Sequence, residues 1–75
     1  MARKPPVHTV PHGDGWANKR EGAARVSKSF DTKAAAQAAG RETARRDKTE
    51  HLIHNRDGEI ASRNSYGNDP NPPKG

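Results

Sequence analysis

Four histidines are the side chains of this sequence best suited to holding a metal ion, because neutral imidazole is a common ligand of zinc and related metals. His51 and His54 lie on one expected strand at positions that face opposite sides of a sheet. His8 and His12 lie on either side of the end of another expected strand. The sequence has no cysteine, and no carboxylate trio with metal-ligand spacing accompanies the histidines. We therefore expect neither a metal site nor a bound cofactor.

Nucleophilic catalysis would need a serine beside a base and an orienting acid. The serines of the expected domain have no recognisable nucleophile motif around them; these are Ser27, Ser29, Ser62 and Ser65. The acids have explanations as turn, cap or strand-end residues. A chain of 75 residues also has little room for the enclosed pocket that small-molecule sites usually occupy. We therefore expect a protein that is not an enzyme and has no small-molecule substrate.

Positive charge is the remaining feature of the sequence that could bind a ligand. Lys and Arg number 14 and Asp and Glu number 9, which gives a formal net charge of +5. The segment from residue 19 to residue 48 alone carries a net charge of +5, and the two flanking segments cancel each other. A concentrated basic stretch is typical of a surface that binds phosphate, whereas cations that only keep a small domain soluble are the alternative explanation.

Two groups of cations are candidates for phosphate contact. The first lies on adjacent expected strands and is our predicted phosphate-binding set: Lys19, Arg20, Arg25 and Lys28. The second is a secondary basic stripe on the outer face of an expected helix, where residues four apart lie above one another: Lys33, Arg41 and Arg45. These two surfaces are expected on different sides of the domain, so they need not form one patch.

The elements that would position these cations follow from hydrophobic period and turn chemistry. Alternating or β-rich segments bounded by glycine-containing turns predict five strands, at residues 7–10, 16–20, 25–30, 51–55 and 59–63. The strongest local signal is Asp57-Gly58, which favours a type I′ hairpin between the last two strands. In that hairpin we expect Leu52 and Ile60 to point inward, with Ile53 facing the opposite way.

A change of period after Phe30 predicts a helix from Thr32 to about Lys48, with the start capped by a short polar side chain. One face of this helix carries only small side chains: Ala35, Ala36, Ala39, Gly40 and Thr43. A mid-helix glycine costs about 1 kcal/mol relative to alanine. We expect close approach to a bulky sheet residue to compensate that cost at Gly40.

These elements predict the α+β class: an antiparallel sheet of about five strands, in the order β-β-β-α-β-β, with one helix packed on one face. We expect a basic tail at residues 1–6, a single α+β domain at 7–67 and a Pro-rich C-terminal tail at 68–75. The apolar core is thin, and a partner subunit often stabilises chains this short. No membrane-spanning or signal segment is expected, and the absence of cysteine fits the cytoplasm.

Four motifs in this order resemble a known family. They are V-H-T-V-P-H-G-D-G-W-A-N-K-R-E-G-A at 7–23, F-D-T-K-A-A-A at 30–36, I-H-N-R-D-G-E-I at 53–60 and S-Y-G-N-D-P-N-P-P-K-G at 65–75. Together they look like the short bacterial family catalogued as domain of unknown function 2188, which brings no established activity or site residues. The sequence departs from that pattern at Asn18, where a β-branched residue is more usual. The resemblance implies that Tyr66, Gly67 and Asn68 dock against something or bind a ligand.

Two functions remain from this reading. The first is a small basic domain associated with DNA or RNA through contacts with backbone phosphates. The second is a protein-interaction module, which includes a homodimer that completes a thin core by pairing sheet faces or edges. Binding that weakens steeply with salt would indicate the first, and concentration-dependent stability would indicate the second.

Overall fold

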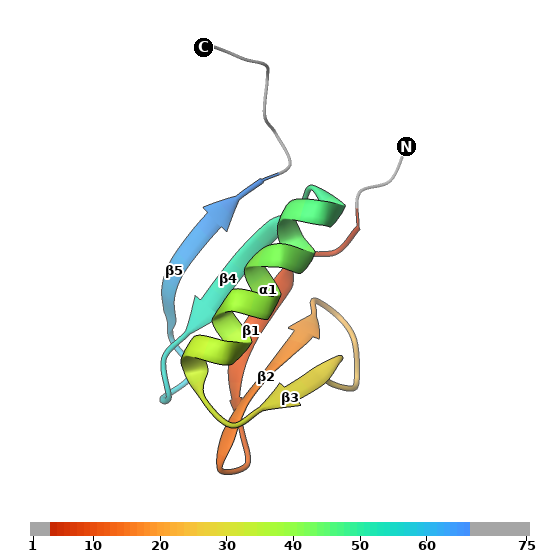
Figure 1. Cartoon of the computed structure of the whole chain (residues 1–75). Coiled ribbons are helices and arrows are strands. Elements are labelled where there is room, and N and C mark those ends of the chain that lie inside the picture. The colour runs from red at the N-terminus through yellow and green to blue at the C-terminus, as the bar shows by residue number, and fades with distance from the viewer. Residues whose placement is uncertain (1–3, 67–75) are drawn as a thin grey trace.

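One five-stranded sheet, covered on one face by one helix, makes up the part of the chain that the computed structural model describes, residues 4–66. The strands are β1 (Val7–His12), β2 (Gly15–Arg20), β3 (Lys28–Phe30), β4 (Glu50–His54) and β5 (Ile60–Ser65), and the helix is α1 (Lys33–Asp47). Their order across the sheet is β3-β2-β1-β4-β5 (Figure 1). The α+β class, the order of elements along the chain and the single helix on one face are therefore confirmed.

The sheet is mixed, since its two central neighbours β1 and β4 run parallel while the other pairs are antiparallel. The helix explains this difference from the expected antiparallel sheet. It begins beside Trp16, where Lys33 lies over the indole ring, and it ends beside Arg20, which contacts Asp47. The chain thus returns along the length of β2 before β4 begins, so β4 starts beside the start of β1.

Local capping fixes both ends of α1. The Thr32 hydroxyl accepts a hydrogen bond from the Ala35 amide at 3.1 Å, and Lys48 adopts a left-handed conformation with φ of 55°. The amide of Thr49 then donates to the Ala44 carbonyl at 3.0 Å, which completes a Schellman-type C-cap. The predicted helix bounds are correct to within one residue.

The third strand is shorter than predicted, because the chain bends after β2. The Ala23 amide donates to the Arg20 carbonyl at 3.0 Å, and Gly22 has a φ of 83°. Backbone hydrogen bonding to β2 resumes at Ser27, whose amide donates to the Asn18 carbonyl at 2.7 Å, and β3 begins at Lys28, opposite Asn18. Arg25 therefore lies in the loop before β3.

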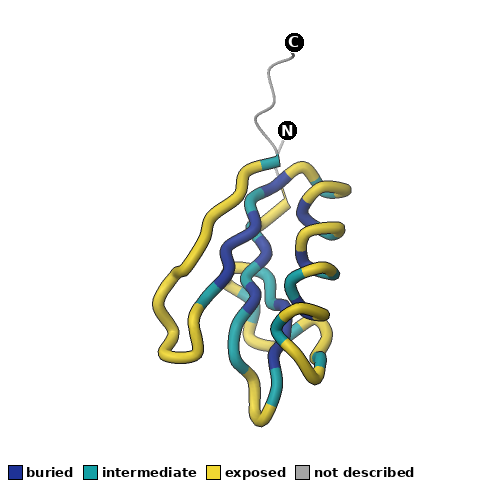
Figure 2. Tube along the Cα trace, turned by 60° about the vertical axis from the view of Figure 1, so that its left-hand side comes forward, coloured by how far each residue is buried: buried dark blue, intermediate teal, exposed yellow. Residues whose placement is uncertain are grey.

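The buried residues lie mostly between α1 and the centre of the sheet (Figure 2). The apolar ones are Val7, Trp16, Ala17, Ala36, Ala44, Leu52 and Ile53. Ile53 faces the helix, on the same side as its neighbour in the register Thr9. The expectation that Ile60 points inward is wrong, since 51% of its surface is exposed. A bulge between Ile53 and His54 pairs Ile60 with His54 on the face that the helix leaves uncovered.

The ends of the domain are described only in part. Residues 1–3 of the expected basic tail and the whole expected tail at 68–75 lie outside the described residues. Lys4 and Pro5 do not behave as a free tail, because their carbonyls accept hydrogen bonds from the Thr49 hydroxyl at 2.8 Å and from Arg20 at 2.9 Å. Within residues 4–66, no helix is long and apolar enough to cross a membrane.

Candidate functional site

Arg20, a member of the predicted phosphate-binding set, has internal partners. Its guanidinium contacts the carboxylate of Asp47 at the end of α1 and donates to the Pro5 carbonyl at 2.9 Å. The hydrogen bond from Arg20, followed by that from Arg46, lowers the pKa of Asp47 below its ordinary value. Arg20 therefore ties β2 to the end of the helix and to the chain before β1.

The other three members of that set lie around the β2 and β3 end of the sheet, on both of its sides. Lys19 pairs in register with His8 and faces the uncovered side. Lys28 pairs with Asn18, and its ammonium lies 5.6 Å from the centre of the Phe30 ring. Among the described residues, neither these two lysines nor Arg25 has a carboxylate within ion-pair distance. Lys19, Arg25 and Lys28 thus lie near the β3 edge of the sheet, but they do not share one face of it.

The secondary basic stripe is divided among three surroundings. The Lys33 ammonium lies 5.0 Å from the centre of the Trp16 ring. Arg41 lines a groove beside the helix. Arg45 lies 3.5 Å from Glu42, with both side chains well exposed. The stripe therefore does not project into solvent as one continuous row of free cations.

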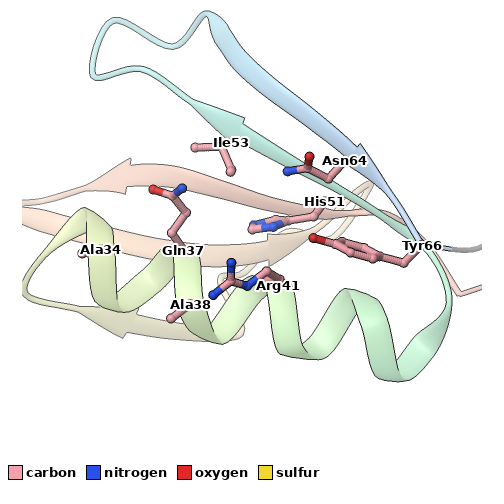
Figure 3. A pocket seen from close by; sticks show the side chains of 8 residues that line it. All are labelled: Ala34, Gln37, Ala38, Arg41, His51, Ile53, Asn64 and Tyr66. Atoms are coloured by element: carbon pink, nitrogen blue, oxygen red, sulfur yellow. The ribbon is translucent and has the colours of Figure 1, made fainter.

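An open groove of about 320 Å³ lies between α1 and the β4–β5 hairpin, and we call it the α1–β5 groove (Figure 3). It is lined by Ala34, Gln37, Ala38, Arg41, His51, Ile53, Asn64 and Tyr66. Two causes leave this space: β5 diverges from the helix (Figure 2), and the helix wall carries the small side chains of Ala34 and Ala38. The sequence predicts no enclosed pocket, and this groove is open to solvent. Tyr66 docks here, while Gly67 and Asn68 lie outside the described residues.

Three buried polar side chains meet beneath the helix, and we call them the buried polar cluster: Thr9, Asn18 and His51. The Thr9 hydroxyl lies 2.6 Å from Asn18 Oδ1 and 2.7 Å from His51 Nε2. Asn18 Nδ2 donates to the Ala36 carbonyl at 2.9 Å. Three neighbouring strands therefore contribute one polar side chain each, and the helix backbone anchors one end of the cluster.

Gly40 allows the helix to approach this cluster. A Cβ atom at Gly40 would lie 2.6 Å from His51 Nε2 and 2.8 Å from Asn18 Oδ1. Real Cβ atoms do not come so close to other heavy atoms, so a glycine is required. The expected close approach at Gly40 exists, and its neighbours are the polar side chains of His51, Asn18 and Thr9.

The directions of these hydrogen bonds determine which nitrogen of His51 carries a proton. The Ala36 carbonyl can only accept, so it orients the Asn18 amide with Nδ2 toward the helix and Oδ1 toward Thr9. Oδ1 can also only accept, so the Thr9 hydroxyl donates to it. The Thr9 oxygen is then the acceptor for His51, and Nε2 must carry the hydrogen. In the neutral ring, Nδ1 is left with a lone pair.

That lone pair has no partner. The His51 residue is only 1% exposed, and within residues 4–66 its Nδ1 is a buried side-chain atom without a hydrogen bond. Burial, followed by the positive charges of Arg41 and His8, lowers the pKa of His51 below its ordinary value. His51 is therefore a neutral hydrogen-bond acceptor at neutral pH, and its ring faces the α1–β5 groove (Figure 3).

The other face of the sheet holds a second pair of histidines. His8 Nδ1 lies 2.8 Å from His54 Nε2, and His8 Nε2 lies 3.0 Å from Glu21. His51 and His54 face opposite sides, as their spacing predicts. In the described part of the chain, no three His, Asp or Glu side chains come together as metal ligands would.

Sequence reasoning missed the buried polar cluster. Thr9 and His51 are 42 positions apart, and only the parallel pairing of β1 with β4 brings them together. One signal was present: Asn18 occupies an inward position of β2, beside Trp16, where a polar side chain needs a buried partner.

Comparison with known proteins adds a family but no activity. The family model described as "Uncharacterized protein conserved in bacteria (DUF2188)" matches residues 7–66. A curated relative, the "Uncharacterized protein YdaT" of Bacillus subtilis (strain 168), is 43% identical over 53 residues, which is 71% of this chain and 35% of that protein. The chain thus spans about a third of the length of this relative. No solved structure matches the chain.

Proposed function

This chain belongs to the bacterial family DUF2188, and from that starting point we propose that it is a small, basic, non-catalytic domain that binds DNA or RNA through backbone phosphates. The supporting observation is that Lys19, Arg25 and Lys28 have no carboxylate partner among the described residues. A cation without a carboxylate partner can neutralise a phosphate and release the counterion that the nucleic acid held there, which strengthens binding. A cation already paired with a carboxylate gains little from the same contact. The same proposal places the domain in the cytoplasm, where bacterial nucleic acids are found.

The contacts of Arg20 support a smaller set of proposed phosphate contacts. Arg20 is engaged with Asp47 and Pro5, so we assign it to the fold and leave phosphate contact to the other three. Lys19 and Lys28 approach from the two sides of the β2–β3 edge, with Arg25 in the loop between their strands. Cations on both sides of a sheet edge can contact a single sugar-phosphate backbone that runs along the edge. They cannot all contact the broad surface of a duplex at once.

A salt-titrated binding assay tests this proposal. Fluorescence anisotropy with labelled mixed-sequence duplex DNA and RNA should give an affinity that falls with salt, with a logarithmic slope of about −3 for three phosphate contacts. The double variant Arg25→Glu, Lys28→Glu should weaken binding at least about tenfold and flatten that slope. Unfolding curves would show that the variant is still folded.

The matched control makes the same change in net charge elsewhere. Arg45→Glu with Arg63→Glu alters α1 and β5, away from β3. It should weaken binding much less than the first pair. Equal losses from the two variants, or no loss from the first, would contradict a phosphate site at the β3 edge.

Assembly through β5 is a second candidate function, favoured by a separate observation. All six residues of this edge strand are exposed, and Ile60 is 51% exposed. An unpaired strand edge beside an exposed apolar residue is a common place for a second chain to add. A homodimer formed there should show a light-scattering mass and a melting temperature that rise with protein concentration and change little with salt. Ile60→Lys should abolish that dependence, and a wild-type protein that stays monomeric at high concentration would exclude this candidate.

A further inference from the structure

We propose that the α1–β5 groove binds a nucleotide, with an N–H group of the base donating to His51 Nδ1 and the phosphate facing Arg41. The groove lies on the helix side of the β4–β5 hairpin, at the opposite edge of the sheet from β3. This inference is therefore independent of the phosphate contacts proposed for Lys19, Arg25 and Lys28. The nucleotide can be a free monophosphate or an unpaired residue at the end of a strand, since both present the same chemistry.

The unpartnered nitrogen sets the first requirement for the ligand. The buried polar cluster fixes the proton of His51 on Nε2, so Nδ1 can only accept. A ligand with acceptors alone, such as sulfate, would place lone pair against lone pair. A base carries N–H groups at its edge, and one of them would satisfy an atom that is otherwise buried without a hydrogen bond.

The remaining lining residues set the other requirements. Arg41 supplies a positive charge at the mouth, and a guanidinium binds phosphate oxygens through two parallel N–H groups. Gln37 and Asn64 offer amides, which match the paired donors and acceptors of a base edge. The methyl groups of Ala34 and Ala38 and the side chain of Ile53 provide apolar surface for a flat ring. Figure 3 shows these side chains arranged around one common space.

The size of the groove agrees with this ligand class. Its volume of about 320 Å³ lies at the lower end of the range for small-molecule sites. A single nucleotide fills such a space, whereas a lone phosphate would leave the apolar wall and His51 uncovered. The openness of the groove toward solvent leaves the phosphate and sugar accessible to the rest of a strand.

The experiment is a titration of the full ¹⁵N-labelled chain with AMP, CMP, GMP and UMP, followed by amide and imidazole resonances. Adenosine, ribose 5-phosphate and inorganic phosphate are the comparison ligands, and a short single-stranded oligonucleotide distinguishes a strand end from a free nucleotide. We expect at least one monophosphate to shift the groove resonances and the His51 Nδ1 signal, with the phosphate-free and base-free ligands binding at least about tenfold more weakly.

Two pairs of surface variants locate the site. Ala38→Met fills the groove and should weaken nucleotide binding at least about tenfold, while Ala35→Met places the same side chain at an exposed helix position that does not line it. Arg41→Gln should weaken the monophosphate but not the nucleoside, whereas Arg46→Gln removes a charge one turn further along and should change neither affinity. Circular dichroism checks that each variant folds.

Three results would overturn the proposal. Ribose 5-phosphate or phosphate binding as tightly as the nucleotide, with uptake of a proton by His51, would show a plain anion site. Equal effects from Ala38→Met and Ala35→Met would place the ligand elsewhere. Unchanged groove resonances at millimolar concentrations of every nucleotide would mean that only water satisfies Nδ1. Loss of duplex binding in the β3-edge variant with nucleotide binding intact would separate this proposal from the proposed function.

Discussion

The Thr9 hydroxyl is the central group of the buried polar cluster, because it donates to Asn18 and accepts from His51 at the same time. Thr9→Val keeps the shape of the side chain and removes the hydroxyl. The buried Asn18 oxygen and the His51 N–H then lose their partners, and each unsatisfied group costs about 1 to 3 kcal/mol.

We therefore expect Thr9→Val to lower the free energy of unfolding by about 2 to 6 kcal/mol, measured by urea denaturation. Thr43→Val is the matched control, because the Thr43 hydroxyl bonds only to the Ala39 carbonyl within the helix and is partly exposed. Its cost should stay below about 1 kcal/mol. A Thr9 variant as stable as the control would show that the cluster does not restrain His51.

For single residues, the sequence predicts which face of the sheet a side chain occupies but not which side chains it contacts. Alternation correctly separates His51 from His54, and it places Asn18 on the same side as Trp16. The contact between Thr9 and His51 depends on the register between β1 and β4. That register follows from where the helix ends, so no local spacing of residues could reveal the candidate site around His51.

Gly40 of α1 is required by the side chains of the sheet beneath it. In an isolated helix, alanine is more stable than glycine by about 1 kcal/mol. Here a methyl group at position 40 would overlap all three members of the buried polar cluster, at 2.6 to 3.0 Å. Moving α1 outward to make room would expose the core that it shares with β1 and β2.

We therefore expect Gly40→Ala to destabilise the domain by about 1 to 3 kcal/mol, the usual range for an overpacked core, despite its gain in helix propensity. Ala35→Gly in the exposed part of the same helix is the control, and it should cost about 1 kcal/mol through propensity alone. Both changes can be measured in one set of urea unfolding curves. A Gly40→Ala protein more stable than wild type would mean that the helix does not rest on the cluster.

The elements themselves were largely predictable, since the change of hydrophobic period and the turn residues mark them. The hairpin around Asp57-Gly58 exists, but its turn is not the predicted type I′. That turn needs a positive φ at both residues, whereas only Gly58 has one, 95°, and the Gly58 amide donates to the Asn55 carbonyl at 2.9 Å. Ile60 lies on the same face of the sheet as Leu52, which is buried, because Ile60 pairs with His54. It is exposed because β5 is an edge strand, all six of whose residues are exposed. The position of β5 at the edge follows from the parallel pairing of β1 with β4, which local sequence does not reveal.

The stability of the whole domain should depend on pH through two groups that act in the same direction. The pKa of His51 is lowered in the folded chain because the ring is buried. As the pH falls, the unfolded chain therefore binds a proton at His51 before the folded chain does. Stability is therefore complete above the ordinary histidine pKa of about 6.5 and falls as pH decreases below it. The carboxylate of Asp47, whose pKa is lowered mainly by Arg20, adds stability that is lost only at more acidic pH, below the ordinary aspartate value.

We expect the free energy of unfolding to decrease below pH 6.5 with a slope that approaches about 1.4 kcal/mol per pH unit for the single proton of His51. Urea unfolding between pH 7.5 and 4.5 measures this slope, an extension to pH 2.5 covers the loss from Asp47, and the imidazole resonances identify the histidine. His51→Gln should flatten the curve in this window and leave the acidic loss from Asp47 in place. If that variant does not fold, the pH dependence of the wild-type imidazole resonances tests the prediction by itself. A His51 ring that titrates at or above pH 6.5 would contradict the neutral tautomer fixed by Thr9. It would also contradict the acceptor role of Nδ1, on which the groove proposal depends.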